Sequence, residues 1–449
     1  MREKYTEYPK QSFFITILFN IYVIAWWLEV AKRIEVLEKI RFEFLLGAIL
    51  CVLALLRLGN LKSKSPEKSK IISGIIIYFI AIIFSLLLTV DFDISWDIFI
   101  NRILKLSAMA FFMNVYIVSP KLLWYFLIST FFAFLKIGQE AFVGKITGNM
   151  MWENQGIMRL HGSPRTMFGH PNSLSGKTVT LLPYLWVLFG LVKKYWKVII
   201  IVQVVFSINI ILFTGSRTGY LATCFLFLAF FIQSKSKIKI GIIIVIASVI
   251  VVYNVPVQYK ERFLSSFSGE EAEGKSKDTR IGLLRDSIQV FVENPFGVGI
   301  GCFVVIQANA GRNEQGTHNL YTQLLSEIGI QGFLAFMYFM YTVIVGLNTS
   351  ILKLNSMINF LNSKLINKDR ASGLKANTIK QEIITLTSLK AVCSGTLIMV
   401  FMRAILGFFG HDLYEIYWWI AAGLSITVLN LMPIAEKRMK EILLAAEQV

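Results

Sequence analysis

Long apolar runs, separated by short polar segments, recur along almost the whole chain of 449 residues. A helix needs roughly 20 residues to cross a hydrocarbon core of about 30 Å. Twelve runs come close to this length, and we therefore expect an all-α integral membrane protein with about twelve transmembrane helices. The runs cover residues 11–30, 42–58, 71–90, 98–118, 122–139, 174–191, 196–214, 218–233, 238–254, 318–347, 384–409 and 413–432.

The composition agrees with a membrane protein. Hydrophobic residues make up 55% of the chain and charged residues 16%, whereas an ordinary soluble domain has about 25% charged residues. The net charge of +17 comes mainly from lysines and arginines in alternate loops, and cytoplasmic loops retain such residues preferentially. We therefore expect the N-terminus inside, the basic loops against membrane lipid, and no binding of nucleic acid.

This orientation leaves two long segments on the outside. The expected organisation is helices one to five in 1–139, an outer loop in 140–173, helices six to nine in 174–254, a large outer loop in 255–317, helix ten in 318–347, a cytoplasmic loop in 348–383, and helices eleven and twelve with a cytoplasmic tail in 384–449. Within the large loop, 263–279 should form a flap and 280–293 an amphipathic helix along the membrane surface. One exception to the charge rule is the first outer loop, with Lys32, Arg33, Lys39 and Arg41 against Glu35 and Glu38.

The stretch FTGSRTGYLA, residues 213–222, places Arg217 between two apolar runs. Gly215 and Gly219 would let the backbone bend and approach a ligand, while Ser216 and Thr218 supply hydroxyl groups. The helix that follows offers unpaired amides at its N-terminus, which attract anions. The stretch is therefore a candidate anion site, with an ordinary helix-hairpin turn as the alternative.

Further cations lie inside the predicted membrane spans. Arg102 and Lys105 fall in the fourth run and Arg403 in the eleventh, all near the expected outer side, where His411 could join Arg403. Each such charge is costly in a membrane, about 2.5–3.5 kcal/mol at the helix centre on insertion scales. They are candidates for a cationic pocket; the alternative is snorkelling or pairing with acidic residues.

Four motifs together resemble the O-antigen ligase and O-antigen polymerase superfamily, membrane glycosyltransferases that use undecaprenyl-diphosphate-linked glycans. The first is SRTGYLA. The second is the outer-loop stretch with Gly162, Phe168, Pro171 and Asn172. The third is the segment with Arg280, Asn294, Pro295, Gly297, Gly299, Gly301 and Phe303. The fourth is His318 and Asn319, then nine residues before Gly329 and Gly332.

The resemblance implies a role for each candidate residue. Arg217 and Arg280 would bind the diphosphate leaving group, and His318, whose ordinary pKa near 6.5 suits a general base, would deprotonate the attacking hydroxyl. Neither a metal nor a cofactor is implied. Ser216, Thr218, Arg102, Lys105, Arg159, Arg165, Asn319 and Arg403 are the candidate substrate-binding residues, although Arg159 and Arg165 have solvated loop charges as the alternative interpretation.

The implied donor is the lipid-linked glycan, and the reaction would occur on the outer face of the bacterial cytoplasmic membrane. The acceptor would be another repeat unit in a polymerase, and lipid A core or a protein in a ligase. Phe333 and Leu334 follow Gly332 where ligases tend to have Thr and Gly, which favours a polymerase. A transporter or flippase of lipid-linked sugars is the alternative from another class.

Two neighbouring features have structural interpretations. Gly297, Gly299 and Gly301 have the spacing of a phosphate loop but follow no strand, which favours a tight turn. Glu327 lies nine residues after His318, about half a turn away on a regular helix. We therefore expect Glu327 to contact another helix.

Overall fold

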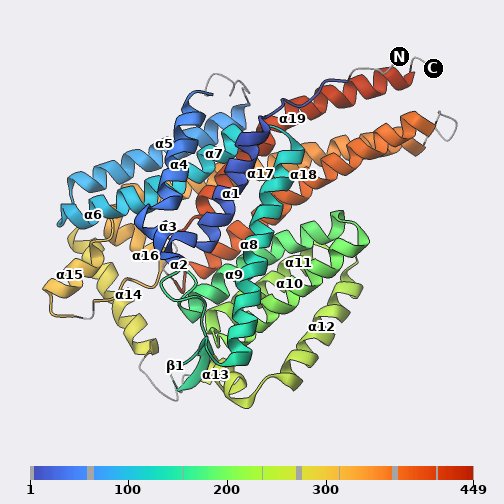
Figure 1. Cartoon of the computed structure of the whole chain (residues 1–449). Helices are drawn as coiled ribbons and strands as arrows, with labels where there is room; N and C mark the ends of the chain where they lie inside the picture. Colours follow the sequence, from blue (N-terminus) through green and yellow to red (C-terminus); the bar gives the residue numbers. More distant parts are fainter. Residues whose placement is uncertain are drawn as a thin grey trace.

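The computed structural model describes residues 5–57, 65–154, 156–234, 236–268, 276–312, 314–366, 373–410 and 413–447. Most of these residues are in helices (Figure 1). Eight helical segments of the described chain are long and apolar enough to span a membrane, and three shorter apolar helices accompany them. The structure thus confirms a helical membrane protein; the number of spans and their orientation stay predictions.

Every predicted run overlaps a helix. The elements are α1 (Phe13–Leu28), α2 (Val30–Arg33), α3 (Glu35–Lys39), α4 (Phe42–Leu55), α5 (Pro66–Leu87), α6 (Phe92–Ile98), the π-helix η2 (Phe99–Leu104), α7 (Lys105–Tyr116), α8 (Pro120–Thr147), β1 (Met151–Asn154), β2 (Ile157–Leu160), α9 (Pro171–Leu191), α10 (Lys194–Phe213), α11 (Arg217–Gln233), α12 (Lys237–Asn254), α13 (Val257–Ser268), α14 (Ser276–Glu293), α15 (Phe303–Asn309), α16 (Leu320–Gln323), the π-helix η3 (Leu324–Ile328), α17 (Gly329–Ile366), α18 (Gly373–Leu406) and α19 (Tyr417–Glu447).

The starts of the long helices follow from local sequence. Ser65 and Ser119 cap α5 and α8, and each is followed by a proline in the first helical turn. The serine hydroxyl accepts an amide hydrogen that the helix cannot satisfy itself, and proline suits the first turn because its missing N–H is not needed there. These signals, more than hydropathy, fix where the spans begin.

Helices α5, α17 and α19 meet at an aromatic cluster. The ring of Tyr78 stacks on that of Phe339 at 5.9 Å between centroids, and Trp419 lies 5.6 Å from Phe339. All three side chains are buried. Apolar burial gives little driving force between helices in lipid, so close packing of such side chains is what holds membrane helices together.

The segment 348–383 differs from the expected cytoplasmic loop. Helix α17 continues to Ile366, and α18 starts at Gly373. The physical reason is an apolar seam: Leu354 and Leu361 on α17 and Ile379 and Leu386 on α18 are buried, at spacings that keep them on one helix face. The two helices thus run side by side and, together with the C-terminal part of α19, project from the bundle (Figure 1).

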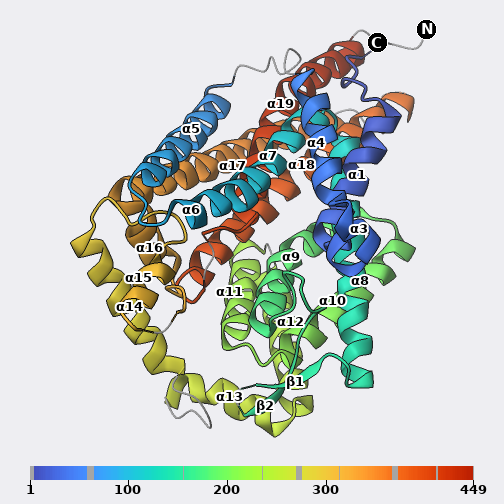
Figure 2. The same ribbon diagram turned by 60° about the vertical axis from the view of Figure 1, so that its left-hand side comes forward.

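Both chain ends lie at one end of the molecule. The hydroxyl of Thr6 donates to Glu441 at 2.6 Å, and Arg438 donates to the Thr6 carbonyl at 2.9 Å. Hairpin β1–β2 and helix α13 lie at the opposite end in both views (Figures 1 and 2). An even number of spans would place the two termini together in this way.

The two expected outer segments contain more regular structure than predicted. In 140–173, α8 continues to Thr147, where Gly148 ends the helix with a positive φ of 79°, and β1 and β2 form an antiparallel hairpin. In 255–317 there are three helices, α13, α14 and α15. Helix α14 includes the predicted amphipathic segment 280–293, although residues 269–275 of the expected flap lie outside the described residues.

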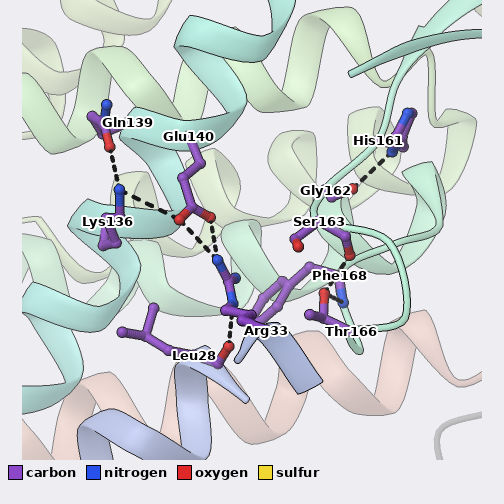
Figure 3. Close-up of polar contacts among 10 residues, drawn as sticks. All are labelled: Leu28, Arg33, Lys136, Gln139, Glu140, His161, Gly162, Ser163, Thr166 and Phe168. Carbon is purple, nitrogen blue, oxygen red and sulfur yellow. Dashed lines mark hydrogen bonds and ion pairs between the residues drawn. The ribbon is translucent and has the colours of Figure 1, made fainter. Parts of the chain in front are cut away.

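The excess basic charge of the first outer loop is compensated by ion pairs. Lys32 pairs with Glu29 at 2.6 Å and Lys39 with Glu35 at 2.9 Å. Arg33 reaches both carboxylate oxygens of Glu140 on α8, at 2.8 and 2.7 Å (Figure 3). The loop is thereby attached to α8 at Glu140, beside the segment 161–168 (Figure 3).

We expect Glu140→Ala to lower the free energy of unfolding by about 1.5–3 kcal/mol, the usual range for hydrogen bonds to a charged group. Both side chains of this pair are less than one-fifth exposed. Thermal unfolding of the purified protein in detergent micelles measures the change. Glu35→Ala is the matched control, because its pair with Lys39 is 80% and 72% exposed and should contribute little. Equal melting temperatures for the two variants would contradict the prediction.

Candidate functional site

The turn that connects α10 to α11 is called the SRTG turn after the sequence of residues 216–219. Gly215 adopts a positive φ of 56°, a conformation that is costly for residues with a Cβ atom. Ser216 caps α11 by accepting a hydrogen bond from the Gly219 amide at 3.2 Å. Arg217 is therefore the first residue of a helix, and its side chain is half-buried, as is that of Thr218.

The glycine at 219 serves a different purpose from the one expected. A Cβ atom at this position would lie 2.0 Å from the hydroxyl oxygen of Ser175 on α9. Gly219 thus permits close packing of α11 on α9, and the helix N-terminus is held by another helix rather than opened toward a ligand. Only Gly215 bends the chain.

Arg159 on β2 is buried, with only 1% of its surface exposed. The alternative interpretation of Arg159 as a solvated loop charge is therefore wrong. Its Nε donates to the carbonyl of Thr214 at 2.7 Å, and its two terminal nitrogens donate to Asn154 at 2.8 Å and Asn172 at 2.6 Å. These bonds join the hairpin, the SRTG turn and the start of α9. They also give the motif residue Asn172 a role, as a ligand of this guanidinium.

Arg262 on α13 is a site residue that the sequence analysis missed. Its Nε donates to the Gly215 carbonyl at 2.8 Å, so that its guanidinium lies against the SRTG turn. Helix α13 is fixed there because the hydroxyl of Tyr259 donates to the Met158 carbonyl at 2.7 Å, and the Tyr220 and Phe263 rings meet at 5.8 Å. The sequence does contain a pattern that could have identified this helix, because Tyr259, Arg262 and Phe263 have the spacing of residues on one helix face.

The structure gathers four arginines from four segments: Arg159 on β2, Arg217 in the turn, Arg262 on α13 and Arg280 on α14. Burial lowers the pKa of Arg159 to about 9. The charges of the other three arginines act in the same direction, which means that they lie close to it. Like charges brought together in a partly buried place disfavour their own charged forms. A bound anion would relieve this repulsion, and guanidinium groups hold phosphate particularly well.

His318 stands where the sequence analysis expected it, at the mouth of the helical segment that begins at Leu320. Its φ is 52°, a left-handed conformation that costs a non-glycine residue about 1–3 kcal/mol and is found mainly at functional sites. Asn319 stabilises this turn: its side-chain oxygen accepts from the amides of Tyr321 at 2.9 Å and Thr322 at 3.1 Å. Asn319 therefore caps the helix and positions the histidine.

The pKa of His318 depends on its burial and on one of the four arginines. Burial lowers its pKa to about 4, with further contributions from the charges of Arg280 and His170. The imidazole is therefore neutral at pH 7 and can accept a proton. The expected pKa near 6.5 does not hold for the free protein, because burial, and to a lesser extent neighbouring positive charge, oppose protonation of the imidazole.

The buried carboxyl group of Glu327 holds the turn that contains Gly301. Glu327 in η3 accepts hydrogen bonds from the Tyr414 hydroxyl and from the amide of Gly301 at 2.9 Å. We expected Glu327 to contact another helix: its carboxyl group contacts residues in turns instead, whereas its carbonyl oxygen accepts from the Ser85 hydroxyl of α5 at 3.0 Å. The glycine series forms the expected tight turn, since Gly297, Gly299 and Gly301 all have positive φ.

The intramembrane cations gather around an acidic residue. Lys177 on α9 binds both carboxylate oxygens of Glu415, each at 2.8 Å. Burial opposes ionisation of Glu415, but the charges of Lys177, Arg403 and Arg102 lower its pKa below the ordinary value. Arg403 is itself buried and lies 3.6 Å above the Tyr417 ring. This arrangement corresponds to the alternative of pairing with an acidic partner.

Three other candidates have simpler surroundings. Lys105 is exposed, and Arg165 is an exposed residue that pairs with Glu38 of α3. His411 lies outside the described residues.

Comparison with known proteins agrees with the motifs. Residues 202–337 match a family model described as O-antigen ligase. This segment runs from α10 into α17 and includes Arg217, Arg262, Arg280 and His318. No curated protein matches the chain. The match supports the resemblance drawn from the motifs, and the matched segment contains three of the four clustered arginines and the histidine.

Proposed function

We propose that the protein transfers a glycan from an undecaprenyl-diphosphate carrier to an acceptor hydroxyl, on the outer face of the cytoplasmic membrane. The observation that carries the proposal is the convergence of Arg159, Arg217, Arg262 and Arg280 beside a neutral His318. A compartment without nucleotide sugars requires a donor that arrives already activated. A sugar linked through its anomeric carbon to a lipid diphosphate meets this requirement.

In the proposed reaction the acceptor oxygen attacks the anomeric carbon of the donor. The bond between that carbon and the diphosphate oxygen breaks, and the diphosphate leaves with the electron pair. His318 takes the proton of the attacking hydroxyl. Arg217, Arg262 and Arg280 stabilise the charge that develops on the departing oxygen, which is the role that fixed cations perform best. Arg159 acts as a positioning residue, because each of its three nitrogens already donates a hydrogen bond, to Thr214, Asn154 and Asn172.

The donor itself would adjust the strength of the base. Arg280 lowers the pKa of His318 in the free protein. A bound diphosphate brings negative charge next to the same arginine and offsets its effect, so the pKa of His318 should rise when the donor binds. The histidine would then be the stronger base only when a leaving group is in place.

The twelve-span topology belongs to this proposal. With the N-terminus inside, hairpin β1–β2, α13 and α14 face the exterior, and α14 lies along the membrane surface. In support, Ile281 and Ile288 of α14 are each 48% exposed, while Leu283 and Val290 on its other side are buried against the protein. An apolar stripe of this kind suits the headgroup region.

The proposal has two forms, a polymerase and a ligase, which differ in the acceptor. Phe333 and Leu334 after Gly332 favour a polymerase of O-antigen or capsule-like repeat units. The matched family is described as O-antigen ligase, which favours transfer to lipid A core or to a protein as the second candidate. The family match supports glycan transfer over transport in either case.

The assay that tests the proposal combines purified protein with synthetic undecaprenyl-diphosphate repeat units, without nucleotide sugar or added metal. A ladder of products supports a polymerase, and transfer only to added lipid A core or protein supports a ligase. Absence of any product, while lipid-linked sugars cross liposome membranes, would overturn the proposal in favour of a transporter.

We expect Arg217→Ala and His318→Ala each to lower the rate of transfer about 100-fold or more, because each removes a group that acts in the transition state. Initial rates at saturating substrates measure the effect. Arg312→Ala is the matched control: Arg312 pairs with Asp286 at 2.9 Å and is 44% exposed, so its rate should stay within about twofold of wild type. Near-normal activity of Arg217→Ala or His318→Ala would reject the assigned role.

The pH profile provides a separate prediction. A base with a pKa of about 4 in the free protein should leave kcat/KM level from neutral pH down to the acid range, with a loss only near pH 4. The kcat profile reports the donor complex, in which the pKa of His318 is raised, and its acid limb should therefore lie at higher pH. Acid limbs at the same pH in both profiles would contradict the proposed coupling between donor and base.

A further inference from the structure

The hairpin β1–β2 presents an aromatic side chain on the face that meets the arginine cluster. Trp152 is the direct partner of Arg159 in the register of the hairpin, and Asn154 is the partner of Ile157. Partners on antiparallel strands point to the same face, as do alternate residues of one strand. Trp152 thus shares its face with Arg159, yet it is 37% exposed whereas Arg159 is 1% exposed.

Two histidines border the indole ring. The ring of His161 lies 5.7 Å from it, tilted by 42°, and the ring of His170 lies 6.1 Å from it in an edge-on arrangement. Neither histidine belongs to the proposed reaction. Both belong to the loop that carries the motif residues Gly162 and Phe168.

The hydrogen bonds of the two rings determine what each offers to a ligand. The Nδ1 of His161 contacts the Gly162 carbonyl at 2.7 Å and must donate to it, so the neutral ring has an acceptor at Nε2. The Nδ1 of His170 accepts from the Asn172 amide at 3.2 Å, so the neutral ring has a donor at Nε2. Burial and the charge of Arg159 lower the pKa of His170 and favour this neutral form. One acceptor and one donor therefore flank the indole.

This group of side chains lies beside the proposed reaction centre. His170 is close enough to His318 to affect its protonation, and close enough to Arg159 to be affected in turn. His170 also caps α9 directly before Pro171, which fixes its ring in place. A molecule that contacts the Trp152 ring would reach toward both His318 and the arginines.

A sugar ring matches this arrangement. One face of a pyranose ring carries mainly C–H groups and packs well on an indole, which combines a large apolar surface with a polar edge. Its hydroxyl groups both donate and accept hydrogen bonds, as the pair of histidines requires. A lipid chain would leave the two Nε2 atoms unsatisfied.

We propose that Trp152, His161 and His170 form a subsite that binds a sugar ring of the glycan. The inference rests on the proposed glycan transfer, and it adds to it a place where the carbohydrate portion is recognised. The donor and the acceptor both supply such a ring next to the reacting atoms. The kinetic arm of the experiment decides between them.

The first test measures carbohydrate binding without lipid or phosphate. The probe is the reducing oligosaccharide released by mild acid from the host's own lipid-linked glycan, and the readout is saturation-transfer NMR with the protein in nanodiscs. We expect wild type to bind the probe, Trp152→Ala to bind about tenfold more weakly because the stacking surface is lost, and Trp152→Phe to stay within about threefold of wild type. Equal binding by wild type and Trp152→Ala, or no binding by wild type, would overturn the proposal.

Two controls separate this subsite from other effects. Trp196→Ala removes an indole that is 44% exposed near the start of α10, at the opposite end of that helix from the SRTG turn, and should leave binding unchanged. Arg217→Ala should also bind the phosphate-free probe like wild type. If the protein binds this probe through Trp152 but transfers no glycan, the subsite stands and the proposed function fails.

The second test identifies the sugar. Initial rates are measured with Trp152→Ala while donor and acceptor are varied in turn. A tenfold rise in KM for the donor alone assigns the subsite to the donor glycan, and a rise for the acceptor alone assigns it to the acceptor. Unchanged KM values with a lower kcat would instead show that Trp152 acts by positioning His318, and would reject the subsite.

Discussion

The buried guanidinium of Arg159 is the interaction on which the site depends. A charge that is 1% exposed is tolerated only if its donors are satisfied, and here they are satisfied by the hairpin, by the carbonyl of Thr214 and by Asn172 at the start of α9. Thr214 lies 55 residues from Arg159 in the sequence and Asn172 lies 13 residues from it. One side chain thus sets the position of the SRTG turn relative to the loop that contains His170.

This arrangement places like charges together and keeps the nearby histidine neutral. Arg262 and Arg217 approach Arg159 across the turn, and the fourth arginine, on α14, affects both Arg159 and His318. In a protein with a net charge of +17, such a concentration of cations acts as a region of positive potential for anionic lipids. In the proposed reaction this positive potential is present before a donor binds, and burial together with Arg280 keeps the histidine neutral at that stage.

The sequence predicted the helices well because a span needs a long apolar run, and such runs are visible without tertiary information. It also identified the segments that meet at the site, because Arg217, Arg280 and His318 stand in recognisable motifs. It did not reveal the hairpin, whose four-residue strands depend on Arg159 and its partners, or Arg262, whose position follows from the docking of α13 on the turn. The helical pairing across 348–383 was hidden by its many polar residues, since only a narrow seam is apolar.

The π-helix at Leu324–Ile328 lies within the nine-residue interval between the histidine motif and Gly329, and it affects what a change in the length of this interval would do. A π-helical turn accommodates one residue more than an α-helical turn, and here it brings Glu327 under the glycine turn. The wider turn lets the segment hold one residue more than an α-helix between the same two ends, so removal of one residue would be absorbed at the turn that carries Glu327 and would not rotate His318. A change of length in this interval would therefore act first on Glu327 and on the glycine turn that it holds, and only through them on the histidine.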